Sequence, residues 1–325
     1  MMMYLQVIGG FVILVVAAEL MVRGAVVLAD RMGISPMVIG MTVVAFGTSA
    51  PELVVSLQAS LSGSPGLAVG NIVGSNIANI WLILGAACLV TPILAKPDAL
   101  RRDVVMLVGG SILFAALILT GELSLLAGVV LLVVFVAFLA TSYFRGADDP
   151  DIAQEQREEI EELEKGFINN VPVATVAAII GVIGLAFGAD LLVQGGSEIA
   201  RSFGVSEEVI GLTLFAFGTS LPELAASVVA AYRSHPDVAI GNVLGSNIFN
   251  MLLVGGVMSA VTVVPVAGQV IDFDIWVMLV ATLMLLPVLL GVVKLTRGLA
   301  ALYFALYLGY VGMQAYGVNR ILAMV

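Results

Sequence analysis

Long apolar runs alternate along this chain with short polar breaks. A transmembrane helix needs roughly 20 mostly apolar residues, because the hydrocarbon core of a bilayer is about 30 Å thick. On that measure the candidate spans are Tyr4–Arg31, Ser35–Leu61, Leu67–Val90, Asp103–Thr120, Glu122–Phe144, Val171–Phe203, Ser206–Tyr232, Val238–Pro265, Phe273–Val293 and Leu299–Ile321. The pattern predicts an all-α, polytopic membrane protein with ten transmembrane helices.

The composition also indicates a membrane protein, and it excludes several classes of function. The chain is 61% hydrophobic and 11% charged, a proportion that a soluble domain cannot bury. Its one cysteine, Cys88, lies in an apolar run, so an intrachain disulfide is excluded. The sequence has no nucleophile–base set, no phosphate-binding loop and no basic patch with interleaved aromatic residues. We therefore expect neither an enzyme nor a nucleic-acid partner. The lipid bilayer is the expected surrounding, and no obligate protein partner is evident.

One segment of the chain occurs twice. Residues Gly40–Ile80 and Gly211–Met251 align without a gap, so each residue has its counterpart 171 positions later. Both copies place Gly-Thr-Ser-X-Pro-Glu inside one apolar run and Gly-Asn-X-X-Gly-Ser-Asn-X-X-Asn inside the next. The match extends back into the first span, where Ala17–Ser35 aligns with Gly188–Ser206. A duplicated segment with polar residues at membrane depth is typical of transporters built from two repeats.

The duplication predicts how the chain is divided. Residues 1–145 form a first repeat of five spans, residues 146–170 an acidic loop, and residues 171–325 a second repeat of five spans. An odd number of spans makes the second repeat enter the membrane in the opposite direction. The expected architecture is therefore two inverted five-helix repeats.

Lysine and arginine residues set the expected orientation, because they concentrate in cytoplasmic loops. With the N-terminus outside, the inside segments hold 10 of the 13 basic residues. The outside segments hold only Arg201 and Arg320, and Arg23 lies within the first span. We therefore expect both termini on the outer side of the membrane and the acidic loop on its cytoplasmic side.

Glu52 and Glu223 are the strongest candidate site residues. Each lies near the middle of an apolar run, where an ionised carboxylate costs several kcal/mol unless a cation accompanies it. Neither run contains a lysine or an arginine. A mobile cation is therefore the expected partner, and the alternative is a protonated, hydrogen-bonded structural glutamate.

A broken helix is predicted around each glutamate. Pro51 and Pro222 lack an amide hydrogen and clash with the carbonyl one turn earlier, which belongs to a glycine in both copies. We expect the carbonyls of residues 45–47 and 216–218 to be freed toward a cavity. Hydroxyl groups lie on the same turns, at Thr48, Ser49, Thr219 and Ser220. Such hard oxygen ligands suit calcium and sodium, although one copy alone would equally fit a plain helix kink.

The following span of each repeat supplies the other wall of the predicted site. Ser75 and Asn79 lie four residues apart and share a helical face, as do Ser246 and Asn250. The other asparagines of the motif lie on other faces, where we expect them to satisfy broken backbone or to bind between helices. They are Asn71, Asn76, Asn242 and Asn247.

Two further acidic residues occupy matching positions in the first span of each repeat. Glu19 has Arg23 at the i,i+4 spacing, and its counterpart Asp190 has Gln194. We expect structural or gating roles for both acidic residues rather than ion binding.

These motifs resemble the alpha-repeat signatures of the cation/calcium antiporter superfamily, specifically its sodium/calcium exchanger branch. The resemblance covers nearly the whole chain, and the short central loop resembles that of prokaryotic members. It implies that Glu52 and Glu223 bind calcium centrally, helped by Thr48 and Thr219. It also implies flanking sodium ligands and a closing pair of asparagines, namely the carbonyls of Ala45 and Ala216 together with Ser49, Ser75, Ser220, Ser246, Asn79 and Asn250. The potassium-dependent branch and some prokaryotic relatives carry aspartate at the position of Asn250.

The implied function is secondary active antiport of sodium for calcium by alternating access. The long first and sixth spans would slide past an ion-binding core, with calcium and sodium as transported partners and no cofactor. A calcium/proton antiporter is the nearer alternative, although the proton branch carries a different glutamate motif. A cation channel is the more distant one, because two inverted copies in one chain favour a carrier over a pore.

Overall fold

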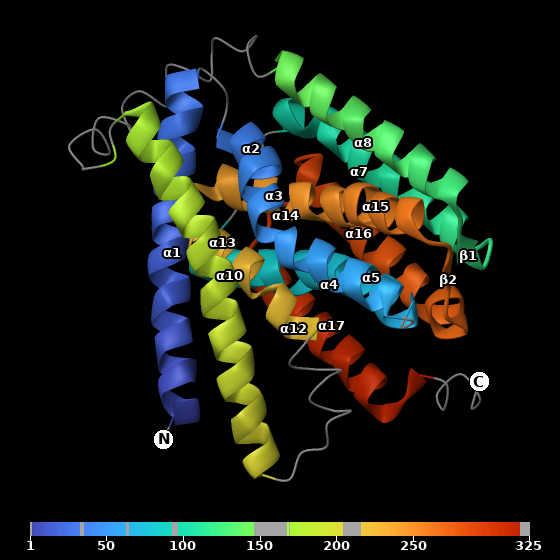
Figure 1. Ribbon diagram of the computed structural model, residues 1–325. Helices are drawn as coiled ribbons and strands as arrows, with labels where there is room; N and C mark the ends of the chain where they lie inside the picture. Colours follow the sequence, from blue (N-terminus) through green and yellow to red (C-terminus); the bar gives the residue numbers. More distant parts are fainter. Residues whose placement is uncertain are drawn as a thin grey trace.

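The computed structural model describes residues 2–32, 36–62, 65–92, 97–145, 168, 170–203 and 216–318. These residues are nearly all helical (Figure 1). Most of the predicted acidic loop and the first part of the predicted span Ser206–Tyr232 lie outside the described residues.

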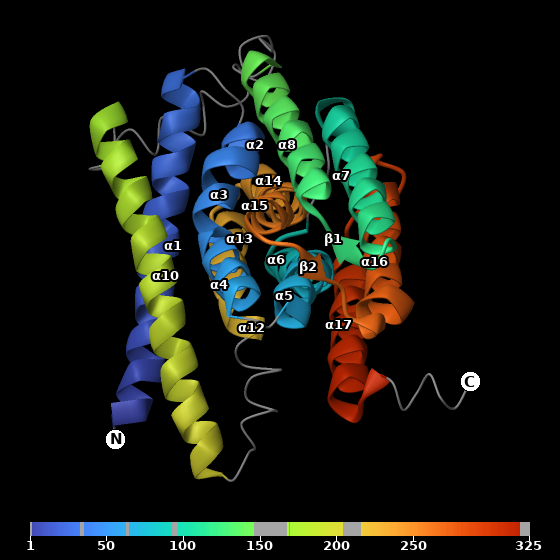
Figure 2. The same cartoon turned by 45° about the vertical axis from the view of Figure 1, so that its right-hand side comes forward.

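Two long helices, α1 (Met2–Met32) and α10 (Val171–Ser202), lie side by side at one edge of the molecule (Figures 1 and 2). They run antiparallel, because Gly10 faces Gly188 while Gly24 faces Ala174. A Cβ atom on Gly10 would lie 2.7 Å from the carbonyl oxygen of Gly188, and one on Gly24 would lie 2.6 Å from that of Ala174. Glycine is required at these positions, since only a residue without a side chain lets two helix backbones approach so closely.

The duplicated segments form the centre of the molecule. The first copy and the residues that flank it form α2 (Pro36–Ile39), the π-helical η1 (Gly40–Val44), α3 (Ala45–Thr48), α4 (Ala50–Leu61), α5 (Pro65–Ala78), the π-helical η2 (Asn79–Ile83) and α6 (Leu84–Val90). The second copy and the residues that follow it form α12 (Ala216–Thr219), α13 (Leu221–Tyr232), α14 (Pro236–Ile248), the π-helical η4 (Phe249–Val254) and α15 (Gly255–Val261). In Figure 2 these central helices lie between the α1–α10 pair and the remaining helices.

The remaining helices cover the opposite side of this centre. They are α7 (Pro97–Ile118), α8 (Leu125–Arg145), the π-helical η5 (Val270–Asp274), α16 (Ile275–Leu289) and α17 (Arg297–Tyr316). Helix α10 begins with the side chain of Asn170 accepting the amide of Val173 at 3.0 Å, and Thr296 caps α17 in the same way. The two caps fix where these helices enter the fold.

One detail corrects the all-α prediction. Two short strands, β1 (Glu122–Leu123) and β2 (Val264–Pro265), pair antiparallel in the connections outside the helices. The turn before β1 depends on Gly121, whose φ of +90° favours glycine. Two connecting loops that meet at one end of the molecule satisfy their backbone groups by pairing with each other, which hydropathy alone does not reveal.

Seven helical segments among the described residues are long and apolar enough to cross a membrane, or eight if the bent pair of residues 40–48 and 50–61 is one span. The seven match predicted spans. Of the other predicted spans, Asp103–Thr120 lies largely in α7, whose first turns also carry Arg101 and Arg102, and Ser206–Tyr232 is only partly described. The described residues thus contain about seven apolar spans, as expected of an integral membrane protein.

Candidate functional site

The two glutamates lie in the first turns of two helices that begin at a break. Ser49, with φ −85° and ψ 4°, separates α3 from α4, and the two helical parts meet at a bend of 48°. Ser220 occupies the same place before α13, with φ −87° and ψ 3°. Glu52 and Glu223 therefore stand near helix N-termini, where the helix dipole favours a negative charge.

The glycines before the breaks have a packing role. A Cβ atom on Gly47 would clash with the side chain of Val182, and one on Gly218 would clash with Val193. Both valines belong to α10, so this long helix packs against α3 of the first copy and α12 of the second. A movement of α10 would thus change the packing next to both glutamate-bearing turns.

The Ala45 carbonyl differs from its prediction. We expected it to be freed by the break, but it accepts the amide of Ser49 at 2.9 Å. The helical turn continues as far as Ser49, so the missing amide hydrogen of Pro51 deprives the carbonyl of Gly47 instead. Ala45 keeps only the second lone pair of its carbonyl oxygen for a ligand role.

Each carboxylate is contacted by a hydroxyl from the other repeat. The Ser49 hydroxyl donates to Oε1 of Glu223 at 3.0 Å, and that of Ser220 contacts Oε1 of Glu52 at 3.4 Å. Ser220 also lies 3.4 Å from the Ser75 hydroxyl. These crossed contacts bring predicted site residues from α4, α5 and α13, and from the breaks between helices, into one cluster.

The cluster is buried and rich in oxygen atoms that lack a donor. Side chains of eleven of the twelve predicted site residues are described, and all are at most 7% exposed; that of Ala216 lies outside the description. Among the described residues, Oε2 of Glu52 and of Glu223 are buried without a hydrogen-bond partner. So are Oδ1 of Asn79, Oγ of Ser246 and both amide atoms of Asn250. Because buried polar atoms are normally paired, these oxygens point to a ligand that accepts electron pairs, which is a cation.

The Asp274 carboxylate, unlike those of Glu52 and Glu223, has a hydrogen-bond donor for each of its oxygen atoms. It is also buried, but Tyr310 and Gln314 of α17 donate to its Oδ1 at 3.1 and 2.5 Å, and Gln269 donates to its Oδ2 at 3.2 Å. Both oxygens are satisfied by neutral donors, so this group ties α17 to α16 and leaves no position for a metal ion. The two glutamates differ because each keeps one oxygen without a donor.

Two serines that the sequence analysis left aside belong to the cluster. The amide of Asn71 donates to the Ser56 hydroxyl at 3.0 Å, and that of Asn242 donates to the Ser227 hydroxyl at 2.9 Å. The expected role of these two asparagines in binding between helices is confirmed. Ser56 and Ser227 follow the glutamates by four residues in both copies, which is the sequence signal that could have identified them.

The remaining motif asparagines break the symmetry of the two copies. The amide of Asn79 donates to Oδ1 of Asn247 at 3.1 Å, which joins the repeats. The counterparts are not joined, because Asn76 donates to the Ile72 carbonyl of its own helix at 3.0 Å and Asn250 has no partner among the described residues. Asn79 and Asn250 both lie within the π-helical segments that follow α5 and α14, a rare helix form that is frequently found at functional sites.

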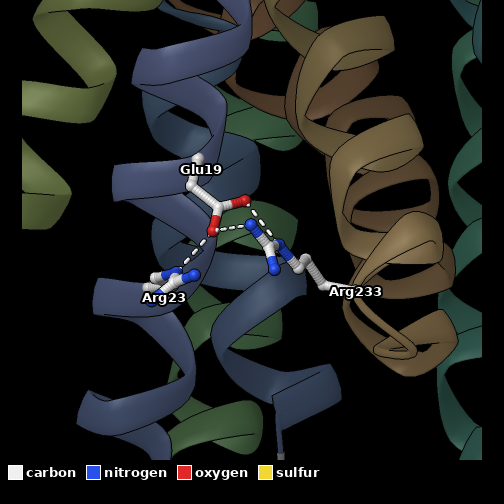
Figure 3. A network of polar contacts seen from close by, with 3 residues as sticks. All are labelled: Glu19, Arg23 and Arg233. Atoms are coloured by element: carbon white, nitrogen blue, oxygen red, sulfur yellow. Dashed lines mark hydrogen bonds and ion pairs between the residues drawn. The ribbon is translucent and has the colours of Figure 1, made fainter. Parts of the chain in front are cut away.

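Glu19 connects α1 to the glutamate-bearing half of the second copy (Figure 3). Its predicted ion pair with Arg23 is confirmed. Local spacing does not reveal a second partner, Arg233 at the end of α13, whose Nε donates to Oε2 at 2.7 Å and whose second guanidinium nitrogen lies 2.5 Å from Oε1. Asp190 accepts from Gln194 at 2.7 Å, within α10. Glu19 therefore has a long-range partner, whereas the contact of Asp190 with Gln194 is local.

We expect Glu19→Gln to lower the thermal stability of the detergent-solubilised protein. The three side chains are 23 to 42% exposed, so losing the charge should cost only about 1 kcal/mol, or about 2 °C in Tm. Asp190→Asn is the matched control, because it disturbs one helix only. Equal shifts of Tm in the two variants would contradict a specific tie between α1 and α13.

Known proteins of similar sequence are membrane proteins. Residues 2–144 and 173–316 match the family described as "Sodium/calcium exchanger protein". The sodium/calcium exchanger MaX1 of Methanosarcina acetivorans is 31% identical over 87% of this chain and 90% of its own. Inner membrane protein YrbG of Escherichia coli is 38% identical over 78% of each chain.

A solved structure of a sodium-calcium exchanger is also similar to this chain. A structure of the sodium-calcium exchanger NCX_Mj, soaked with sodium and calcium, superposes with a TM-score of 0.82 at 33% identity. The match covers 96% of this chain and 98% of that one. The similarity thus extends over both duplicated segments and the helices around them.

Proposed function

The chain belongs to the sodium/calcium exchanger protein family, whose members are transporters and not enzymes, and on this premise we propose that it exchanges sodium for calcium by alternating access. One observation carries the proposal. Two buried carboxylates, one from each copy, are contacted by hydroxyls of the opposite copy and each keeps an oxygen without a donor. Two carboxylates match the charge of one calcium ion or of two sodium ions, so the two kinds of ion compete for one site.

The proposed ion ligands are the set named from the sequence. They are Glu52, Glu223, Thr48, Thr219, Ser49, Ser220, Ser75, Ser246, Asn79, Asn250 and the carbonyls of Ala45 and Ala216. The transported ions are substrates here, and no cofactor is part of the mechanism.

Calcium/proton exchange is the second candidate. It would also use the glutamates, since a carboxylate can carry a proton. The amide oxygens of Asn79 and Asn250 and the hydroxyl of Ser246 could bind calcium in either kind of exchanger. We rank sodium as the driving ion because the matching family and the relative MaX1 are described as sodium/calcium exchangers.

The experiment is calcium uptake into proteoliposomes that contain the purified protein. Gradients of sodium, potassium and protons are imposed separately. Uptake that requires an opposed sodium gradient supports the proposal. Uptake driven by protons alone would favour the second candidate, and uptake without any opposed gradient would favour a channel.

The proposed architecture is ten helices in two inverted five-helix repeats, residues 1–145 and 171–325. The antiparallel course of α1 and α10 supports inversion, because these helices occupy equivalent positions in the two copies. Helix α8 ends at Arg145 and α10 begins at Val171, which fits a connecting loop of residues 146–170 between the repeats.

The proposed location is the cytoplasmic membrane, with both termini outside. In Figure 1, α8 ends and α10 begins on the side opposite to the start of α1, in agreement with a loop that faces away from the termini. The name of the similar inner membrane protein YrbG supports the membrane assigned. We expect a reporter inserted within residues 154–165 to be cytoplasmic and one at the C-terminus to be external. Finding both reporters on one side would overturn the ten-helix model.

A further inference from the structure

Asn242 lies between two hydroxyl groups, one from each copy. Its amide nitrogen donates to the Ser227 hydroxyl at 2.9 Å and lies 3.4 Å from the backbone carbonyl of Glu223. Because a carbonyl can only accept, the nitrogen end of the amide is fixed on that side. The oxygen end therefore faces Thr48, whose hydroxyl donates to it at 3.2 Å.

The first copy repeats this arrangement. The amide nitrogen of Asn71 donates to the Ser56 hydroxyl at 3.0 Å, and its oxygen accepts from the Thr219 hydroxyl at 3.4 Å. Each line of hydrogen bonds runs from a serine through an asparagine to a threonine of the other copy. Two copies of the same arrangement, made by residues that the duplication relates, argue against a chance contact.

The direction of the hydroxyl proton decides what a threonine offers to a cation. A hydroxyl group has one hydrogen and two lone pairs, and only the lone pairs bind a metal ion. Thr48 has two other acceptors in reach, the Ala45 carbonyl at 3.4 Å and the carboxylate of Glu223. Donation to either would engage an oxygen that is itself a proposed ligand.

We propose that Asn242 and Asn71 are positioning residues that take the hydroxyl protons of Thr48 and Thr219 and so turn the threonine lone pairs toward the transported cation. The inference rests on the proposed function and deepens it. Ser227 and Ser56 hold the asparagine amides in the required orientation. The two asparagines act through the threonines and contact no ion themselves.

A purely structural role for Asn242, joining α14 to its neighbours, is the competing explanation. The two explanations differ in how the effects of substitutions combine. A positioning residue has nothing left to position once the threonine hydroxyl is gone, whereas a residue that only joins helices keeps its effect.

The test is a double-mutant cycle with Thr48→Val and Asn242→Leu. The dissociation constant for calcium is measured by thermal stabilisation of the purified protein, and KM and kcat are measured by uptake into proteoliposomes. Each single variant should raise the dissociation constant and KM about tenfold. For Asn242→Leu, which removes no proposed ligand, kcat at saturating calcium should change much less than KM. In the Thr48→Val background, Asn242→Leu should add less than about twofold. Independent, multiplicative effects would overturn the proposal.

A gentler variant covers the case in which Asn242→Leu fails to fold. Ser227→Ala leaves Asn242 in place but removes its anchor, so KM should rise by about threefold, and Ser227→Thr should restore it. Ser142→Ala is the control, since among the described residues this buried serine donates to the Phe138 carbonyl of its own helix at 2.9 Å and lies away from the cluster. An unchanged KM in Ser227→Ala would overturn the proposal.

Failure of this inference can be told from failure of the proposed function. The binding cycle uses calcium alone and does not depend on sodium. A protein that binds calcium with the expected coupling but does not exchange it for sodium would refute the proposed function only. A protein that exchanges the two ions without the coupling would refute the positioning role only.

Discussion

Replacing either central glutamate with glutamine should abolish calcium transport in a protein that still folds. Glu52→Gln and Glu223→Gln preserve the shape of the side chain and the oxygen that accepts the serine hydroxyl, but each removes one of two buried charges. A dehydrated calcium ion is then left with half of its charge uncompensated. Leaving a buried charge without its partner costs about 3–5 kcal/mol, which corresponds to a loss of roughly two to four orders of magnitude in calcium affinity.

Asp274→Asn is the matched control for this prediction. It also removes a buried carboxylate, but one whose oxygens are both satisfied by side chains of the protein. We expect it to lower Tm while sodium-driven uptake continues. Calcium uptake and Tm are measured for all three variants, and either glutamine variant transporting calcium at the parent rate would remove the central site from this pair of residues.

The duplicated motif identified the polar centre without a structure. Glu52, Ser49 and their counterparts could be named because a carboxylate in an apolar run is costly and because the run occurs twice. The contacts between a serine of one copy and the glutamate of the other could not be predicted. An alignment says which residues are equivalent, but it does not say that Ser49 faces Glu223 rather than Glu52, since that depends on how the two copies pack.

Long-range contacts and π-helical turns could not be predicted from the local spacing of residues. The ion pair of Glu19 with Arg23 follows from i,i+4 geometry, whereas that with Arg233 joins residues 214 positions apart and needs the tertiary fold. The π-helical segments at Asn79 and Asn250 were missed as well, because one extra residue in a turn leaves the apolar pattern nearly unchanged. Packing likewise decides the orientation of a side-chain amide such as that of Asn250.

Asn250→Asp should make calcium transport depend on potassium. The parent pocket carries a charge of about −2 when Glu52 and Glu223 are ionised, which one calcium ion neutralises. Among the described residues no donor or acceptor pairs with the buried amide of Asn250, so the structure gives no support to a role in bonding the broken helix. A carboxylate at this place would raise the charge to about −3 with no protein group to offset it.

A monovalent cation would then be required beside calcium, and potassium should stimulate uptake by about tenfold, the effect of about 1.4 kcal/mol. Sodium-driven calcium flux, measured with and without potassium, tests both proteins, and the parent should need no potassium. Asn250→Ser is the control. It alters the same buried group without adding a charge, so it should create no potassium requirement. The parent protein and Asn250→Asp differ only in whether one unpaired buried group is neutral or negative. A potassium requirement in the parent, or calcium transport by Asn250→Asp that does not respond to potassium, would therefore refute the charge argument.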